Sequence, residues 1–97
     1  MNAVRGEVPL VWGERTHCLC LTLGALAEIE TALGCTSLDE LQIRFRQLST
    51  SELVTILKIL LVAGGTAPDT VTRQWLNQIP PNLASQAVAE AFHAALG

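Results

Sequence analysis

The sequence predicts an α+β fold that is mostly α, with a short N-terminal β-hairpin followed by about five helices packed around a central apolar helix. Three observations support this prediction. One run near the N-terminus alternates between two faces, two Ser-x-x-Glu capping boxes begin later segments, and paired Gly and Pro residues break up the second half. The 97 residues are enough for a single domain spanning 1–97. We divide it into a loose arm (1–6), a hairpin (7–21) and a helical part (22–97).

The hairpin is expected from strands at 8–12 and 15–21. Gly13 at the first position of a two-residue turn suits a type II′ hairpin. Pro9 cannot donate to a ladder, so the first strand should be an edge. The second strand should place Thr16, Cys18 and Cys20 on one face and His17, Leu19 and Leu21 on the other. An isolated hairpin is marginally stable in water, so it should pack on the helices or pair with another chain.

The first two helices are expected at about 23–33 and after Ser37. Thr22 can cap the first helix, and Gly34 suits the left-handed residue that follows its end. The second helix begins with the capping box Ser37-x-x-Glu40. Its apolar stripe should be Leu38, Leu41, Phe45 and Leu48, while Arg44, Arg46 and Gln47 should face solvent.

The third helix follows the capping box Ser49-x-x-Glu52 and is apolar on nearly all sides, so it should lie at the centre of the core. Gly64-Gly65 should end it. A fourth helix is expected from Asp69 or Thr70, with an apolar face formed by Val71, Trp75, Leu76 and Ile79, and with Trp75 in the core. An alanine-rich fifth helix is expected at 83–96, either capped by Asn82 or with Pro81 in its first turn.

The composition limits the possible functions. Charged residues make up 15% of the chain, below the usual share of about 25%, which leaves apolar surface for a partner or for self-association. The net charge is −3, and the basic residues are scattered apart from Arg44 and Arg46, so we expect no nucleic-acid binding. The N-terminus lacks the apolar core of a leader, and the longest apolar run, 53–63, is too short to span a membrane. We expect a cytoplasmic protein.

No residues form a recognisable catalytic, cofactor or metal set, so we expect no enzyme activity. The His17-Cys18-x-Cys20 run lacks a second pair of ligands at zinc-like spacing, and Cys35 alone does not supply one. The cysteines are expected to be reduced and buried. Lys58 is expected to extend along the helix surface. The candidate partner-binding residues are instead the large apolar residues Trp12, Leu10, Phe45 and Phe92.

Two stretches near the N-terminus resemble those of a known family. They are Arg5 to Val8, which lead into the hairpin, and the run LTLGALAEIE from Leu21 to Glu30. A looser similarity continues through Ser37, Leu38 and Leu41, the apolar helix, the two glycines and the alanine-rich C-terminal helix. With these features the chain is similar to the tail protein family of prophages and gene transfer agents. Its members are labelled both tail tube protein and tail assembly chaperone.

The resemblance implies tail morphogenesis in a bacterial host cell, with the tape-measure protein and the tail tube protein as partners. A phage tail tube subunit is built on a β-sandwich or barrel whose sheets join around a ring. Only about a dozen residues here are expected in strands, so the prediction favours the chaperone. Such chaperones are thought to coat the apolar tape-measure protein and to bring tube subunits to it. The alternatives are a structural tail component (tube or connector subunit) and an unrelated protein-interaction domain.

The expected mechanism is binding without chemistry. A groove between helices, or the edge of the hairpin, would hold an amphipathic tape-measure helix. A homo-oligomer could align several copies along one tape-measure chain, so that many weak contacts add together.

Overall fold

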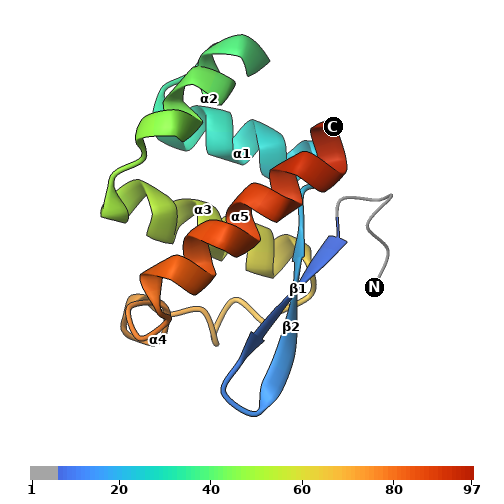
Figure 1. The fold of residues 1–97 in the computed structure, drawn as a ribbon, viewed down its shortest axis with the longest axis vertical. Coiled ribbons are helices and arrows are strands. Elements are labelled where there is room, and N and C mark those ends of the chain that lie inside the picture. Colours follow the sequence, from blue (N-terminus) through green and yellow to red (C-terminus); the bar gives the residue numbers. More distant parts are fainter. Residues whose placement is uncertain (1–6) are drawn as a thin grey trace.

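The computed structural model describes residues 7–97, and the arm expected at 1–6 lies outside them. Within this range the chain forms a two-stranded antiparallel hairpin, five α-helices and one 3₁₀ turn (Figure 1). The elements are β1 (Glu7–Trp12), β2 (Arg15–Cys20), α1 (Leu23–Leu33), α2 (Leu38–Arg44), η2 (Phe45–Gln47), α3 (Thr50–Ala63), α4 (Arg73–Leu76) and α5 (Pro81–Leu96). The predicted α+β, mostly α architecture is confirmed.

The hairpin follows the predicted turn chemistry. Trp12 lies opposite Arg15, which leaves a two-residue turn. Gly13 has φ of 67°, and Glu14 has a negative φ, which is the φ pattern of a type II′ turn. The inner face of the hairpin is buried against the helices and carries Val8, Leu10 and Leu19. The outer face carries Glu7, Pro9, Val11, Thr16, Cys18 and Cys20. The hairpin therefore packs on the helices, as its marginal stability in isolation requires.

The ends of α1 are fixed as the sequence predicts. The Thr22 hydroxyl accepts a hydrogen bond from the Ala25 N–H, and Gly34 adopts a left-handed φ of 69°. The last turn of α1 is also held from outside, because the Arg44 guanidinium donates to the Leu33 carbonyl and forms an ion pair with Glu52. Arg44 therefore joins three helices while its side chain stays 41% exposed, so the prediction that it faces solvent is met only in part. Arg46 and Gln47 are exposed as predicted.

The predicted apolar stripe of the second helix is only partly formed. Leu41 is buried, but Leu38 is 42% exposed, and Phe45 and Leu48 are half-buried. The α-helix ends at Arg44 and continues as the η2 turn. Since a 3₁₀ turn has three residues per turn rather than 3.6, the later apolar residues leave the line set by the first ones. The capping box is also displaced, because the Glu40 carboxylate accepts from the Thr36 N–H.

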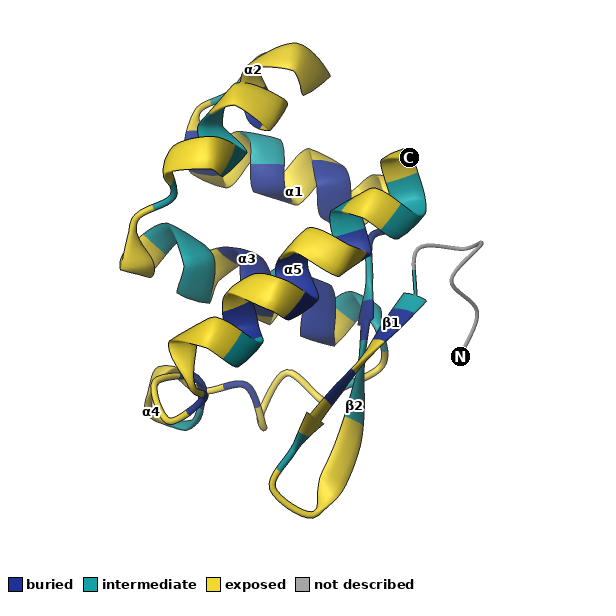
Figure 2. Ribbon diagram, in the orientation of Figure 1, coloured by how far each residue is buried: buried dark blue, intermediate teal, exposed yellow. Residues whose placement is uncertain are grey.

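The centre of the core is α3, which contacts α1, α4, α5 and β2. Its capping box is complete, with Ser49 accepting from Glu52 N–H and Glu52 accepting from Ser49 N–H. Four of its residues are buried, namely Ile56, Leu57, Leu60 and Leu61. Figure 2 shows the buried residues gathered on α3 and on the sides of α1, α5 and the hairpin that face it. The prediction of a central apolar helix is confirmed.

The last two helices begin at different residues from those expected. A turn closed by Thr70 N–H on the Ala67 carbonyl precedes α4, and the Thr72 hydroxyl caps it by accepting from Trp75 N–H. The helix therefore starts at Arg73, later than predicted. Pro81 is the first residue of α5, so the second of the two alternatives for this helix start is the correct one.

Candidate functional site

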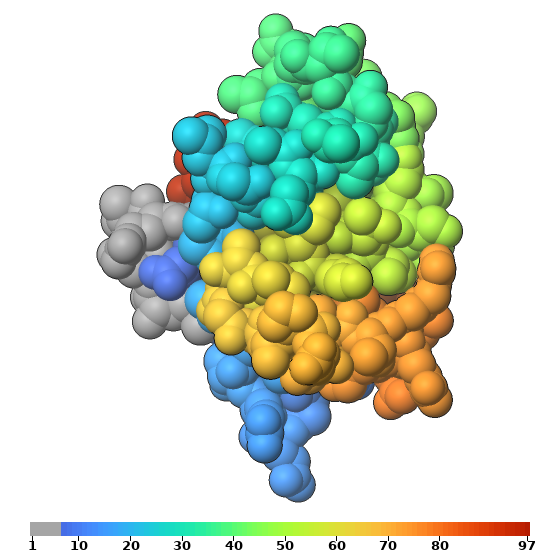
Figure 3. All heavy atoms as spheres, turned by 180° about the vertical axis from the view of Figure 1, so that it is seen from behind, coloured from blue at the N-terminus to red at the C-terminus, as the bar shows by residue number. Residues whose placement is uncertain are grey.

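A groove runs between α1 and α3 on the face of the molecule shown in Figure 3, where the two helices lie side by side and the segment leading into α4 borders α3. Two hollows of about 420 and 470 Å³ share Glu28 and Ile59, and together they form what we call the α1–α3 groove. Its lining consists of Ala27, Glu28, Thr31 and Ala32 of α1, Val54, Thr55, Lys58 and Ile59 of α3, and Arg73 and Leu76 of α4.

The floor of the α1–α3 groove is apolar. It is formed by Val54, Ile59 and Leu76, with small side chains on the α1 wall. The hydroxyls of Thr31 and Thr55 donate to the Ala27 and Ser51 carbonyls of their own helices. Both hydroxyl hydrogens already form hydrogen bonds, so the groove favours apolar contacts with a partner over new hydrogen bonds from these groups.

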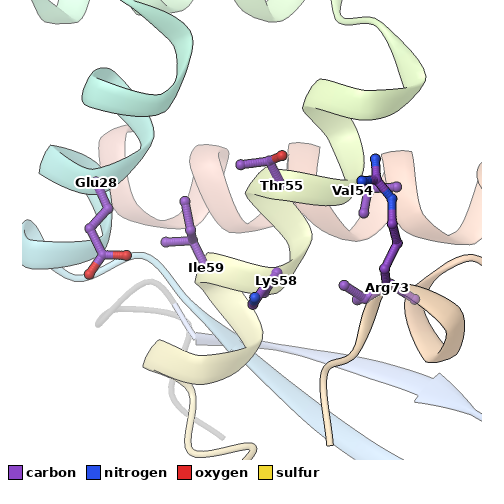
Figure 4. A pocket seen from close by; sticks show the side chains of 7 residues that line it. Glu28, Val54, Thr55, Lys58, Ile59 and Arg73 are labelled. Atoms are coloured by element: carbon purple, nitrogen blue, oxygen red, sulfur yellow. The ribbon is translucent and has the colours of Figure 1, made fainter. Parts of the chain in front are cut away.

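The charges of the α1–α3 groove lie on opposite sides. Glu28 projects from α1, whereas Lys58 and Arg73 come from α3 and α4 (Figure 4). Among residues 7–97 none of the three forms an ion pair. Lys58 is exposed, as expected for a lysine that extends along a helix surface.

Exposed apolar residues continue the α1–α3 groove along both helices. Leu23 is 84% exposed and lies one turn before Ala27, and Val62 is 37% exposed and lies one turn after Ile59. Val11, Leu38, Ile43 and Leu96 are also exposed, away from the groove. The residues along the groove differ in adjoining two hollows, and this arrangement favours contact with another protein.

Trp12 and Trp75 form a second cluster at the tip of the hairpin. Their rings meet edge to face with centroids 5.1 Å apart, and the His17 ring meets Trp75 in the same way at 5.3 Å. Trp75 is half-buried and packs both on the hairpin and against the edge of the core, so its predicted place in the core is met only in part. A hollow of about 370 Å³ beside these rings also includes Glu14 and Arg15.

The four residues proposed from the sequence as partner contacts do not line the α1–α3 groove. Leu10 is 1% exposed and belongs to the core, so it has no surface to offer a partner. Phe45 and Phe92 are half-buried and pack on each other, with centroids 3.7 Å apart. Trp12 is half-buried against Trp75. The buried sides of Trp12, Phe45 and Phe92 pack within the domain, and their role as partner contacts stays a prediction.

Cys18 lies on the outer face of the hairpin beside Glu7. Its Sγ donates a weak hydrogen bond to Glu7 Oε2 at 3.9 Å. Burial raises the pKa of the Cys18 thiol, and the Glu7 carboxylate and the Cys20 thiol raise it further. A raised pKa keeps more of the sulfur in the unreactive thiol form at pH 8.

We expect Cys18 to react slowly with a disulfide reagent at pH 8. In a variant with Cys20 and Cys35 changed to serine, Glu7→Gln should speed the reaction several-fold, because it removes a negative charge that opposes thiolate formation. The rate of DTNB labelling measures this directly. Equal rates for the two variants would show that the carboxylate does not control the thiol.

Within residues 7–97, no three side chains of His, Cys, Asp or Glu gather closely enough to hold a metal ion. In the same range, every helix is too short or too polar to traverse a bilayer.

The family model described as "Phage tail tube protein, GTA-gp10" matches residues 5–97 of the 97-residue chain. The chain belongs to this family. It is therefore a phage-tail-related protein, as the residues near its N-terminus suggest. No curated protein and no solved structure shows a significant match to it. The family places the α1–α3 groove in a protein that works with other tail proteins.

Proposed function

We propose that this protein is a tail assembly chaperone. It binds the tape-measure protein in the α1–α3 groove, brings tail tube subunits to it and performs no chemistry. The main alternative is a structural tail component, which the words "tail tube protein" in the family description favour. A tube wall requires strands that pair from one subunit to the next. The main support for our proposal is that both edges of the hairpin are blocked near their middle.

The edge of β1 is closed by Pro9. In a hairpin with a two-residue turn, the residues flanking the turn form a hydrogen-bonded pair, and hydrogen-bonded pairs then alternate with pairs whose backbone groups point outward. Trp12 and Arg15 flank the turn, so Pro9 and Cys18 are an outward-pointing pair. Pro9 has no N–H to offer there, so a strand added to this edge would lack a hydrogen bond at its middle.

The edge of β2 is closed by α3. A Cβ added to Gly64 would lie 2.6 Å from the Cys18 carbonyl carbon, and still closer to its oxygen. The end of α3 therefore lies directly against the outward-pointing carbonyl in the middle of β2. No room remains there for a neighbouring strand.

The α1–α3 groove suits an apolar polypeptide segment. Its two hollows of about 420 and 470 Å³ are each larger than the roughly 150 Å³ that accommodates a benzene ring. A long apolar tape-measure chain could occupy this groove on many copies of the protein at once, so that weak single contacts would add together.

The proposal is tested by placing a charge in the α1–α3 groove. We expect Ala27→Asp to reduce co-purification with the tape-measure protein at least about tenfold, since an unpaired carboxylate would be desolvated on binding. Ala89→Asp is the matched control, because Ala89 is also an exposed alanine within a helix and lies outside the groove.

Both variants should retain the wild-type circular dichroism spectrum. If Ala27→Asp captured the tape-measure protein as well as Ala89→Asp does, this groove would not be the binding site. If the unmodified chain failed to capture it at all, the chaperone function itself would be contradicted.

A further inference from the structure

We infer that the α1–α3 groove takes an amphipathic α-helix that carries an acidic residue on one flank of its apolar stripe and a basic residue on the other. This inference rests on the proposed function and adds the chemistry of the partner. It follows from the shape of the groove and from the charges on its two sides.

The occupant should be a helix because the groove offers no strand edge with which an extended segment could pair. The lining comes from α1, α3 and α4, and no strand borders it. An extended segment laid in an apolar groove would leave its own N–H and C=O groups without partners, which is costly. A helix satisfies these groups internally and presents only side chains, which can pack between the side chains of α1 and α3.

The charged residues define the flanks of that helix. Lys58 comes from α3 and Arg73 from α4, and neither forms an ion pair with any residue in 7–97. Glu28 faces them from α1 (Figure 4). An acidic residue of the partner would lie over Lys58 and Arg73, and a basic residue over Glu28. Because a helix turned end for end exchanges its flanks, this asymmetry also sets the direction in which it binds.

The experiment compares two helical peptides with the same apolar stripe. The mixed peptide carries Glu on one flank and Lys on the other, and the basic peptide carries Lys on both. Long-range attraction to a chain of net charge −3 favours the basic peptide. We expect the opposite order, with the mixed peptide binding roughly fivefold tighter by fluorescence anisotropy, since rim ion pairs contribute up to about 1 kcal/mol each.

A charge reversal gives the matching control. The double variant Lys58→Glu, Arg73→Glu should prefer the basic peptide. The double variant Arg15→Glu, Arg46→Glu makes the same charge change at exposed sites outside the α1–α3 groove and should keep the wild-type preference.

Three outcomes overturn the inference. If the wild-type protein binds the basic peptide as tightly as the mixed one, the charge pattern is wrong. If neither peptide binds although the tape-measure protein still co-purifies, the helical occupant is wrong and the chaperone function stands. If neither the peptides nor the tape-measure protein bind, both proposals fail together.

Discussion

Replacing Gly64 with alanine is expected to lower the free energy of unfolding by about 3 kcal/mol, the upper part of the range for adding a methyl group to a tightly packed site. The cause is space rather than backbone conformation, because Gly64 has an ordinary φ of −83°. The new Cβ would overlap the Cys18 carbonyl. These are backbone atoms, so no side chain can move aside, and α3 would have to separate from β2.

Gly24→Ala is the matched control for this substitution. Gly24 lies in the first turn of α1, and the nearest atom to an added Cβ is Thr22 Oγ1 at an ordinary 3.9 Å. Alanine should stabilise this position by about 0.5 kcal/mol, because glycine is a poor helix former. Urea unfolding followed by circular dichroism measures both variants. A Gly64→Ala variant as stable as Gly24→Ala would show that α3 does not approach β2 so closely.

Leu10→Ala is expected to cost about 3 kcal/mol of stability, because it removes a fully buried side chain and leaves a cavity. Leu10 is 1% exposed, whereas its neighbour Val11 is 63% exposed on the other face of β1. Val11→Ala should change stability by no more than about 0.5 kcal/mol.

The same pair of variants separates a core residue from a contact residue. Under native conditions the remaining folded Leu10→Ala protein should still bind the tape-measure protein. If Leu10→Ala kept its stability and lost that binding, Leu10 would be a partner contact, as the sequence predicted.

Local features of this fold could be predicted because the residues that cause them are close in sequence. Gly13 sets the hairpin turn, Thr22 and Ser49 cap their helices, and Gly34 ends α1. Each of these uses hydrogen bonds or dihedral angles within a few residues. The central place of α3 was also predictable, since a helix apolar on nearly all sides has to be covered.

The features that depend on tertiary contacts could not be predicted. Arg44 looks like a solvent-facing residue until the Leu33 carbonyl and Glu52 are brought beside it. From the sequence, Gly64 is only a residue that ends a helix. Its contact with Cys18 depends on how α3 packs against the hairpin.

The α1–α3 groove was missed for the same reason. Glu28 and Lys58 each look like ordinary solvated charges, and Ala27 like any exposed helical alanine. Only the packing of α1 beside α3 gives them a common surface. The one signal in the sequence was the low share of charged residues, 15%, which indicated spare apolar surface without locating it.

The central claim is that this protein captures the tape-measure protein and does not itself form a tube. The most direct measurement is its mass in solution by size exclusion with light scattering, alone and after co-expression with the tape-measure protein of the same tail. We predict a monomer or small oligomer alone, and a soluble complex containing the tape-measure protein after co-expression. Large rings or tubes formed by the chain alone, without capture of the tape-measure protein, would contradict the account and indicate a structural tail subunit.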